Sequence, residues 1–77
     1  MEIKVLGPGC AKCDKTQKII QAVVDETSMD ASVEKITDML EIAKYGVMGT
    51  PAVVVNGKVK SVGKVPGKDE IRSWLSE

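Results

Sequence analysis

The spacing of apolar and polar residues changes several times along this chain, and each change marks an expected element. Residues 2–6 alternate and end at Gly7-Pro8-Gly9, which predicts a short strand followed by a turn. From residue 10 to about residue 27, buried-type residues recur at steps of three and four, which predicts a helix with one buried face. The residues of this stripe are Cys13, Thr16, Ile20, Val23 and Thr27, with Ile19 and Val24 beside them.

The middle of the chain predicts a second strand and a short helix. Residues 31–36 read as a strand, with Val33 expected on one face and Lys35 on the other. Asp38 followed by Glu41 resembles a capping box and opens the helix. Gly46 is expected to end it.

The last third predicts a hairpin and a final helix. Residues 52–55 are almost all β-branched, as expected of a strand covered on both faces. Asn56-Gly57 is a strong hairpin signal, and residues 58–62 alternate like an edge strand with one face in water. A helix follows from about residue 68 to residue 76, with Ile71, Trp74 and Leu75 on one face.

The predicted order is therefore β-α-β-α-β-β-α in a single α/β domain over residues 1–77. The first βαβ unit is expected to be parallel and right-handed. The hairpin adds two antiparallel strands, which gives a four-stranded mixed sheet with helices on both faces.

Composition excludes several classes of function. The 11 basic and 11 acidic residues balance, so charge does not indicate a nucleic acid or a membrane as partner. One Trp, one Tyr and no Phe leave no stacking platform for bases. No apolar run approaches the roughly 20 residues of a membrane helix, and the N-terminus does not resemble a signal peptide. A cytoplasmic location is the expectation.

Both cysteines of the protein lie in Cys10-Ala11-Lys12-Cys13, at the start of the first predicted helix. Their sulfurs would lie one turn apart, so the pair can cycle between dithiol and disulfide. The first turn of a helix favours an anion and therefore a thiolate, which is the nucleophile in disulfide exchange. Lys12 and Lys15 would add positive potential there. Alternatively, these lysines belong to a solvated face with an Asp14–Lys18 pair.

Two other roles for the cysteine pair remain open. A structural disulfide that closes only four residues gains about 2 kcal/mol in the loop-closure model, against about 5 kcal/mol for a long loop. A soft-metal site for Cu(I) or Zn is the second alternative, because thiolates suit these ions. Since the chain has no His and only two Cys, a closed zinc site would need carboxylates or a second chain.

With these motifs in this order, the chain resembles the thioredoxin superfamily, and most closely its small thioredoxin-like or glutaredoxin-like redox-active disulfide proteins. The resemblance covers nearly the whole chain. It rests on the Cys10–Cys13 motif after the first strand, Gly46-Val47-Met48-Gly49-Thr50-Pro51 before the third, the Asn56-Gly57 hairpin, and Gly63 before the last helix. The chain departs from thioredoxins proper in having Gly9 where they have Trp, and Ala11-Lys12 where they have Gly-Pro.

The resemblance implies a thiol–disulfide oxidoreductase that reduces protein disulfides. Cys10 is expected to be the nucleophile and Cys13 the resolving residue. A cis peptide bond before Pro51 would place the backbone of Thr50 beside Cys10, where a substrate segment can pair with it. Gly9 and Lys12 complete the expected substrate site.

The same resemblance implies an electron-transport role without a cofactor other than the Cys10–Cys13 disulfide and without a bound metal. The expected partners are disulfide-containing proteins and a thioredoxin-reductase-type donor or glutathione, and the protein is expected to be a monomer. A third possibility is an adaptor that binds partners without turnover through an apolar rim of Pro8, Val47 and Met48.

Overall fold

The computed structural model describes residues 1–9, 11–28 and 30–76. Its strands and helices follow the predicted order. They are β1 (Glu2–Leu6), α1 (Ala11–Thr27), β2 (Ser32–Ile36), α2 (Met39–Lys44), β3 (Ala52–Val55), β4 (Lys58–Val62) and α3 (Lys68–Leu75). The thioredoxin-like α/β fold class predicted from the sequence is confirmed.

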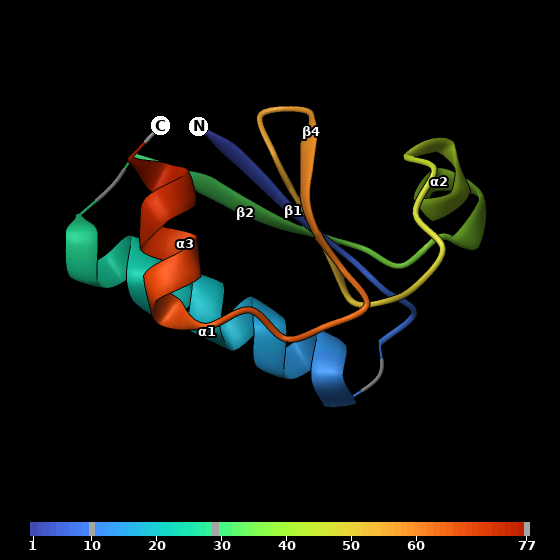
Figure 1. The fold of residues 1–77 in the computed structure, drawn as a ribbon, viewed down its shortest axis with the longest axis horizontal. Helices are drawn as coiled ribbons and strands as arrows, with labels where there is room; N and C mark the ends of the chain where they lie inside the picture. Colours follow the sequence, from blue (N-terminus) through green and yellow to red (C-terminus); the bar gives the residue numbers. More distant parts are fainter. Residues whose placement is uncertain (10, 29, 77) are drawn as a thin grey trace.

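The four strands form one mixed sheet in the order β2-β1-β3-β4. β1 pairs in parallel with β2 and antiparallel with β3, and β3 pairs antiparallel with β4 through the predicted hairpin. The strand that comes first in the chain is therefore an inner strand, hydrogen-bonded on both sides. Figure 1 shows α1 and α3 side by side along one side of the sheet, with α2 set apart from them.

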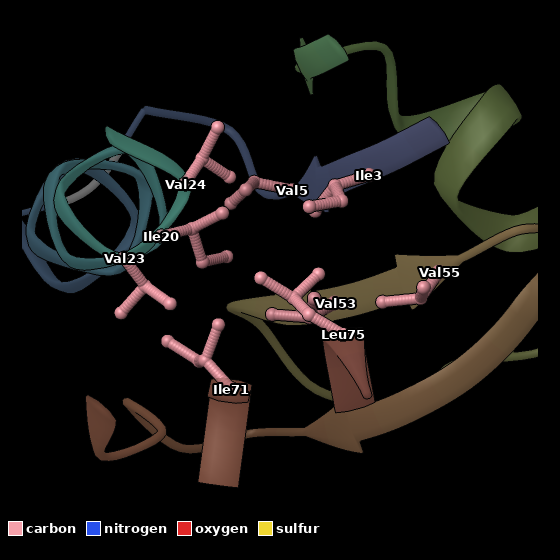
Figure 2. Packing of buried hydrophobic residues seen from close by; sticks show 9 residues of the cluster. All are labelled: Ile3, Val5, Ile20, Val23, Val24, Val53, Val55, Ile71 and Leu75. Carbon is pink, nitrogen blue, oxygen red and sulfur yellow. The ribbon is translucent and has the colours of Figure 1, made fainter. Parts of the chain in front are cut away.

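The larger core lies between the sheet and the pair formed by α1 and α3. Figure 2 shows its side chains converging from the two helices and from β1 and β3. Its buried members are Ile3, Val5, Ile20, Val23, Val24, Val53, Val55, Ile71 and Leu75. The stripe on α1 forms because its three- and four-residue steps bring one side of the helix onto the sheet.

A smaller core lies on the opposite face of the sheet, beneath α2. Its buried members are Leu6, Ile42, Ala52 and Val54. Asp38 caps this helix by accepting a hydrogen bond from the backbone N–H of Leu40 at 2.9 Å. The N–H of Gly46 donates to the carbonyl of Ala43 just after the helix ends. All four residues of β3 are buried between the two cores, as the β-branched run predicted.

Two predicted side-chain placements are wrong. Val33 packs against the larger core, and Lys35 forms an ion pair with Asp14 of α1, so both side chains lie on the same side of β2. The reason is the two-residue period of a strand, which returns residues i and i+2 to one face. Thr27 is exposed, and its hydroxyl donates back to the carbonyl of Val23 at 2.8 Å.

The edge strand β4 does not alternate as expected. The pairing with β3 shifts between Val53 and Val54, so the strand carries a bulge. As a result Ser61 is buried while Val59 and Val62 are 40% and 45% exposed. A bulge of this kind twists an edge strand away from regular pairing, which adds to the effect of its lysines.

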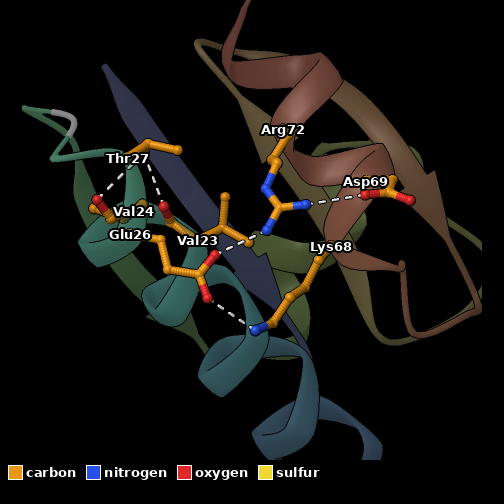
Figure 3. Close-up of polar contacts among 7 residues, drawn as sticks. All are labelled: Val23, Val24, Glu26, Thr27, Lys68, Asp69 and Arg72. Carbon is orange, nitrogen blue, oxygen red and sulfur yellow. Dashed lines mark hydrogen bonds and ion pairs between the residues drawn. The ribbon is translucent and has the colours of Figure 1, made fainter.

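Ion pairs join the end of α1 to α3 (Figure 3). The carboxylate of Glu26 accepts from Lys68 at 3.0 Å and from Arg72 at 2.9 Å. Arg72 also binds Asp69 within α3. Hydrogen bonds from Lys68 and then Arg72 hold the pKa of Glu26 below its usual value. These contacts join the two helices at the end of α1 farthest from Cys13.

Candidate functional site

Cys13 is the third residue of α1, and its side chain is fully buried. It is the first member of the buried stripe, so the same spacing that folds the helix onto the sheet also carries this sulfur inward. Cys10 lies outside the described residues. The sulfur of Cys13, the predicted resolving residue, is therefore sheltered from solvent in the first turn of α1.

The end of β1 lies directly against this sulfur. Gly7 is buried, and its N–H donates to the carbonyl of Ile36 at 2.9 Å, which extends the parallel pairing by one residue. A Cβ atom placed on Gly7 would overlap the Sγ of Cys13 and would lie 3.8 Å from the Cβ of Thr50. Three segments thus meet at one point: the end of β1, the first turn of α1, and the loop that precedes β3.

The loop before β3 carries the predicted proline. The Thr50–Pro51 peptide bond is cis, the isomer that the resemblance implied. Pro51 is fully buried and Thr50 is half-buried. The carbonyl of Pro51 accepts a hydrogen bond from the N–H of Gly63 at 2.9 Å, so the loop is held against the residue that follows β4.

Gly49 and Gly63 allow the loop before β3 to approach the end of β4 closely. Gly63 has a left-handed backbone with a φ of +74°, which side chains disfavour. A Cβ on Gly49 would lie 3.4 Å from the Cα of Gly63, at the near limit of ordinary van der Waals contact. The loop and the end of β4 are therefore packed backbone to backbone.

The remaining predicted site residues lie at the surface. Gly9 and Lys12 are exposed, with Gly9 at a φ of +95°. The Lys12 carbonyl accepts from the buried hydroxyl of Thr16 at 2.8 Å, one turn further along α1. Of the predicted site residues, Cys13 and Thr50 both lie close to Gly7.

The solvent-facing side of the first turns of α1 carries several charges. Asp14 pairs with Lys35 of β2, whereas the sequence suggested Lys18 as its partner. A hydrogen bond from Lys35 holds the pKa of Asp14 below its ordinary value, and the nearby charge of Lys18 adds to this effect. Asp14 is thus engaged across the helix–sheet boundary, while Lys12 and Lys15 are exposed.

The predicted apolar rim is only partly present. Met48 is 97% exposed and Pro8 is exposed, but Val47 is half-buried and packs against the smaller core. Sequence reasoning treated Gly7 as part of a turn and missed its contact with Cys13. Its only signal in the sequence was a glycine directly after an apolar strand.

The described residues contain no cluster of three or more His, Cys, Asp or Glu side chains able to hold a metal ion. Within the same described ranges, no helix is long and apolar enough to cross a membrane.

Known proteins are similar to this chain over almost its whole length. Residues 1–76 match a family model described as a thioredoxin domain. A thioredoxin of Methanothermobacter thermautotrophicus is 38% identical over 76 residues, which cover 99% of each chain. A thioredoxin of Methanocaldococcus jannaschii is 37% identical over 73 residues, covering 95% of this chain and 84% of the relative.

Proposed function

Since this chain belongs to the thioredoxin superfamily, a family of thiol–disulfide oxidoreductases, we propose that it reduces disulfide bonds of protein substrates through a Cys10–Cys13 cycle. The observation that carries the proposal is the buried sulfur of Cys13 in the first turn of α1, three residues after the only other cysteine. A sheltered second thiol is what a resolving residue needs, because it must attack its neighbour and avoid outside reagents.

The proposed reaction has two exchange steps. The thiolate of Cys10 attacks one sulfur of the substrate disulfide, a mixed disulfide forms, and the first substrate thiolate leaves. The deprotonated sulfur of Cys13 then attacks the sulfur of Cys10, and the second substrate thiolate leaves and takes up a proton. The substrate disulfide gains two electrons, and the protein dithiol becomes the Cys10–Cys13 disulfide.

The beginning of α1 supports the first step. The helix begins at Ala11, directly after Cys10 in the sequence, so the dipole at its N-terminal end favours a thiolate at that position. The exposed side chains of Lys12 and Lys15 add positive charge to these turns. A thiolate stabilised in this way is the reactive form in exchange.

The loop with Thr50 and Pro51 supports substrate binding. We assign Thr50 the role of pairing with an extended substrate segment through its backbone, with Pro51, Gly9 and Lys12 completing the surface. The hydrogen bond from Gly63 to Pro51 supports this assignment because it anchors the loop from the β4 side.

The electron donor is proposed to be a thioredoxin-reductase-type protein or glutathione, with the protein acting as a cytoplasmic monomer in electron transport. No cofactor is needed beyond the redox-active disulfide. The proposed direction is reduction of the substrate, as expected where thiols are kept reduced.

The test compares wild-type protein with Cys10→Ser and Cys13→Ser on a disulfide-bonded protein substrate. We expect Cys10→Ser to abolish exchange and Cys13→Ser to accumulate a mixed disulfide visible by mass spectrometry. Exchange that survives in Cys10→Ser would reverse the two roles. Inactive wild-type protein that binds Cu(I) stoichiometrically through both thiols would replace the proposal with a metal-binding function.

A further inference from the structure

Among the glycines, only Gly7 lies close enough to Cys13 for an added Cβ to meet its sulfur. The proposed function gives Gly7 no role. Its backbone is not in the left-handed region, so its own conformation does not require glycine. The requirement comes from space: a Cβ on Gly7 would overlap the Sγ of Cys13 and would lie 3.1 Å from the Cβ of that residue.

The overlap can be relieved only by moving a fully buried side chain or the backbone that carries it. Cys13 has one side-chain torsion, and its side chain is fully buried. Gly7 is held in the sheet by its hydrogen bond to Ile36, and the preceding residue, Leu6, is also fully buried. An added methyl group therefore has to turn the sulfur away or lift the first turn of α1.

The same methyl group would meet Thr50 only at an ordinary contact distance of 3.8 Å. Its effect is thus directed at the sulfur of Cys13 and leaves the loop before β3 in place. This difference separates Gly7 from the glycines that shape the loop, Gly49 and Gly63.

From this geometry we infer that Gly7 is a positioning residue for the resolving step: its missing side chain sets where the sulfur of Cys13 lies. The inference rests on the proposed function, in which that sulfur attacks the mixed disulfide at Cys10. Displacing a reacting atom by about 1 Å can slow a step by about 100-fold. We expect Gly7→Ala to slow resolution and to leave the first attack unchanged.

The experiment uses the reduced protein and the chromogenic aryl disulfide dithiobis-nitrobenzoate. Attack by Cys10 releases one coloured thiolate, and resolution by Cys13 releases the second, so a stopped-flow trace separates the two steps. In Gly7→Ala the second release should slow at least about tenfold. Gly67→Ala is the matched control, because Gly67 is exposed and nothing lies within 4 Å of its added Cβ; both releases should match wild type.

A Gly7→Ala trace with both releases as in wild type overturns the inference and leaves the proposed function standing. Wild-type protein that never releases the second thiolate overturns the proposed function itself. The two failures are therefore distinguishable in one set of traces.

A second measurement does not require the variant to be active, only to fold and to unfold in one cooperative transition. The loss in Tm caused by Gly7→Ala is measured in the wild-type background and in Cys13→Ala. If the sulfur fills the space beside Gly7, the loss should fall by at least half when the sulfur is absent. Equal losses in both backgrounds would show that Gly7 does not make room for the sulfur, and would overturn the inference.

Discussion

The backbone N–H of Gly63 donates a hydrogen bond to the carbonyl of Pro51 at 2.9 Å. This contact joins the residue after β4 to the loop before β3, across the end of the hairpin. It extends the antiparallel pairing beyond the last pair of the ladder, Ala52 with Val62. The proposed substrate loop is therefore an extension of the sheet rather than a separate surface segment.

Gly63→Ala tests this relationship. Its left-handed backbone should make alanine cost about 1–2 kcal/mol in the free energy of unfolding. Because the strain falls on the residue that holds Pro51, disulfide exchange should also slow by about tenfold. The measurements are urea unfolding and the rate of reduction of a protein disulfide.

The matched control for Gly63 is Gly57→Ala in the hairpin turn. Gly57 has a φ of +82°, close to that of Gly63, and nothing lies within 4 Å of its added Cβ. The loss of stability should be similar in the two variants, with no change in exchange for Gly57→Ala. Equal exchange rates in the two variants would show that the hydrogen bond between Gly63 and Pro51 does not affect disulfide exchange.

Glu26→Gln should change how stability depends on pH. Because Lys68 and Arg72 lower the folded-state pKa of Glu26, its carboxylate favours folding above the unfolded value of about 4.3, and that contribution is lost as pH falls through the folded value. The variant should therefore be less stable than wild type at neutral pH, and the two should converge in acid. Thermal unfolding followed between neutral pH and about pH 3 measures the difference.

Glu41→Gln is the control for Glu26, since the ion pair of Glu41 with Lys44 stays within α2. A pair within one short helix does not join two elements, so its removal should matter less. If the Glu26→Gln difference persisted unchanged in acid, the ion pairs to α3 would not be its source.

Burial predicts unequal reactivity of the two thiols. In folded, reduced protein Cys13 should alkylate slowly, because its side chain is fully buried, and it should become reactive in denaturant. If Cys10 is the activated nucleophile, its alkylation should have a pH midpoint below the free-thiol value of about 8.5. Peptide mapping by mass spectrometry after short exposures to iodoacetamide measures both, and equal rates at the two cysteines would contradict the assignment of roles.

Ile20→Ala tests the larger core. The side chain of Ile20 is fully buried between α1 and the sheet, so its truncation should lower the free energy of unfolding by about 2–5 kcal/mol. Leu40→Ala is the control, because Leu40 is 76% exposed and should change stability by less than about 0.5 kcal/mol. Urea unfolding compares the two, and similar losses would be inconsistent with this core.

The sequence predicted the elements well because each has a clear period and a clear terminator. The β-branched run of β3 indicated burial on both faces, and the structure buries all four residues. Asp38 and Gly46 marked the ends of α2 through local hydrogen bonds that depend on neighbouring residues only. Signals of this local kind can be read from a single chain.

What the sequence did not predict depends on contacts between distant elements. The bulge in β4 arises from its pairing with β3, and it exposes Val62 while burying Ser61. Asp14 has Lys18 one turn away, yet it pairs with Lys35 because β2 packs beside α1. The role of Gly7 likewise becomes visible only when α1 lies on the sheet.

The inner position of β1 has a consequence for the order in which the protein is synthesised. β1 and the Cys10–Cys13 motif are synthesised before β3, and β1 gains its second neighbour only when Ala52–Val55 has been made. Thr50, which lies near Gly7 as Cys13 does, comes shortly before that late segment in the chain. A nascent chain therefore carries both thiols well before the fold that shelters Cys13 can form, and during that interval the two thiols are open to oxidation and to pairing with other chains.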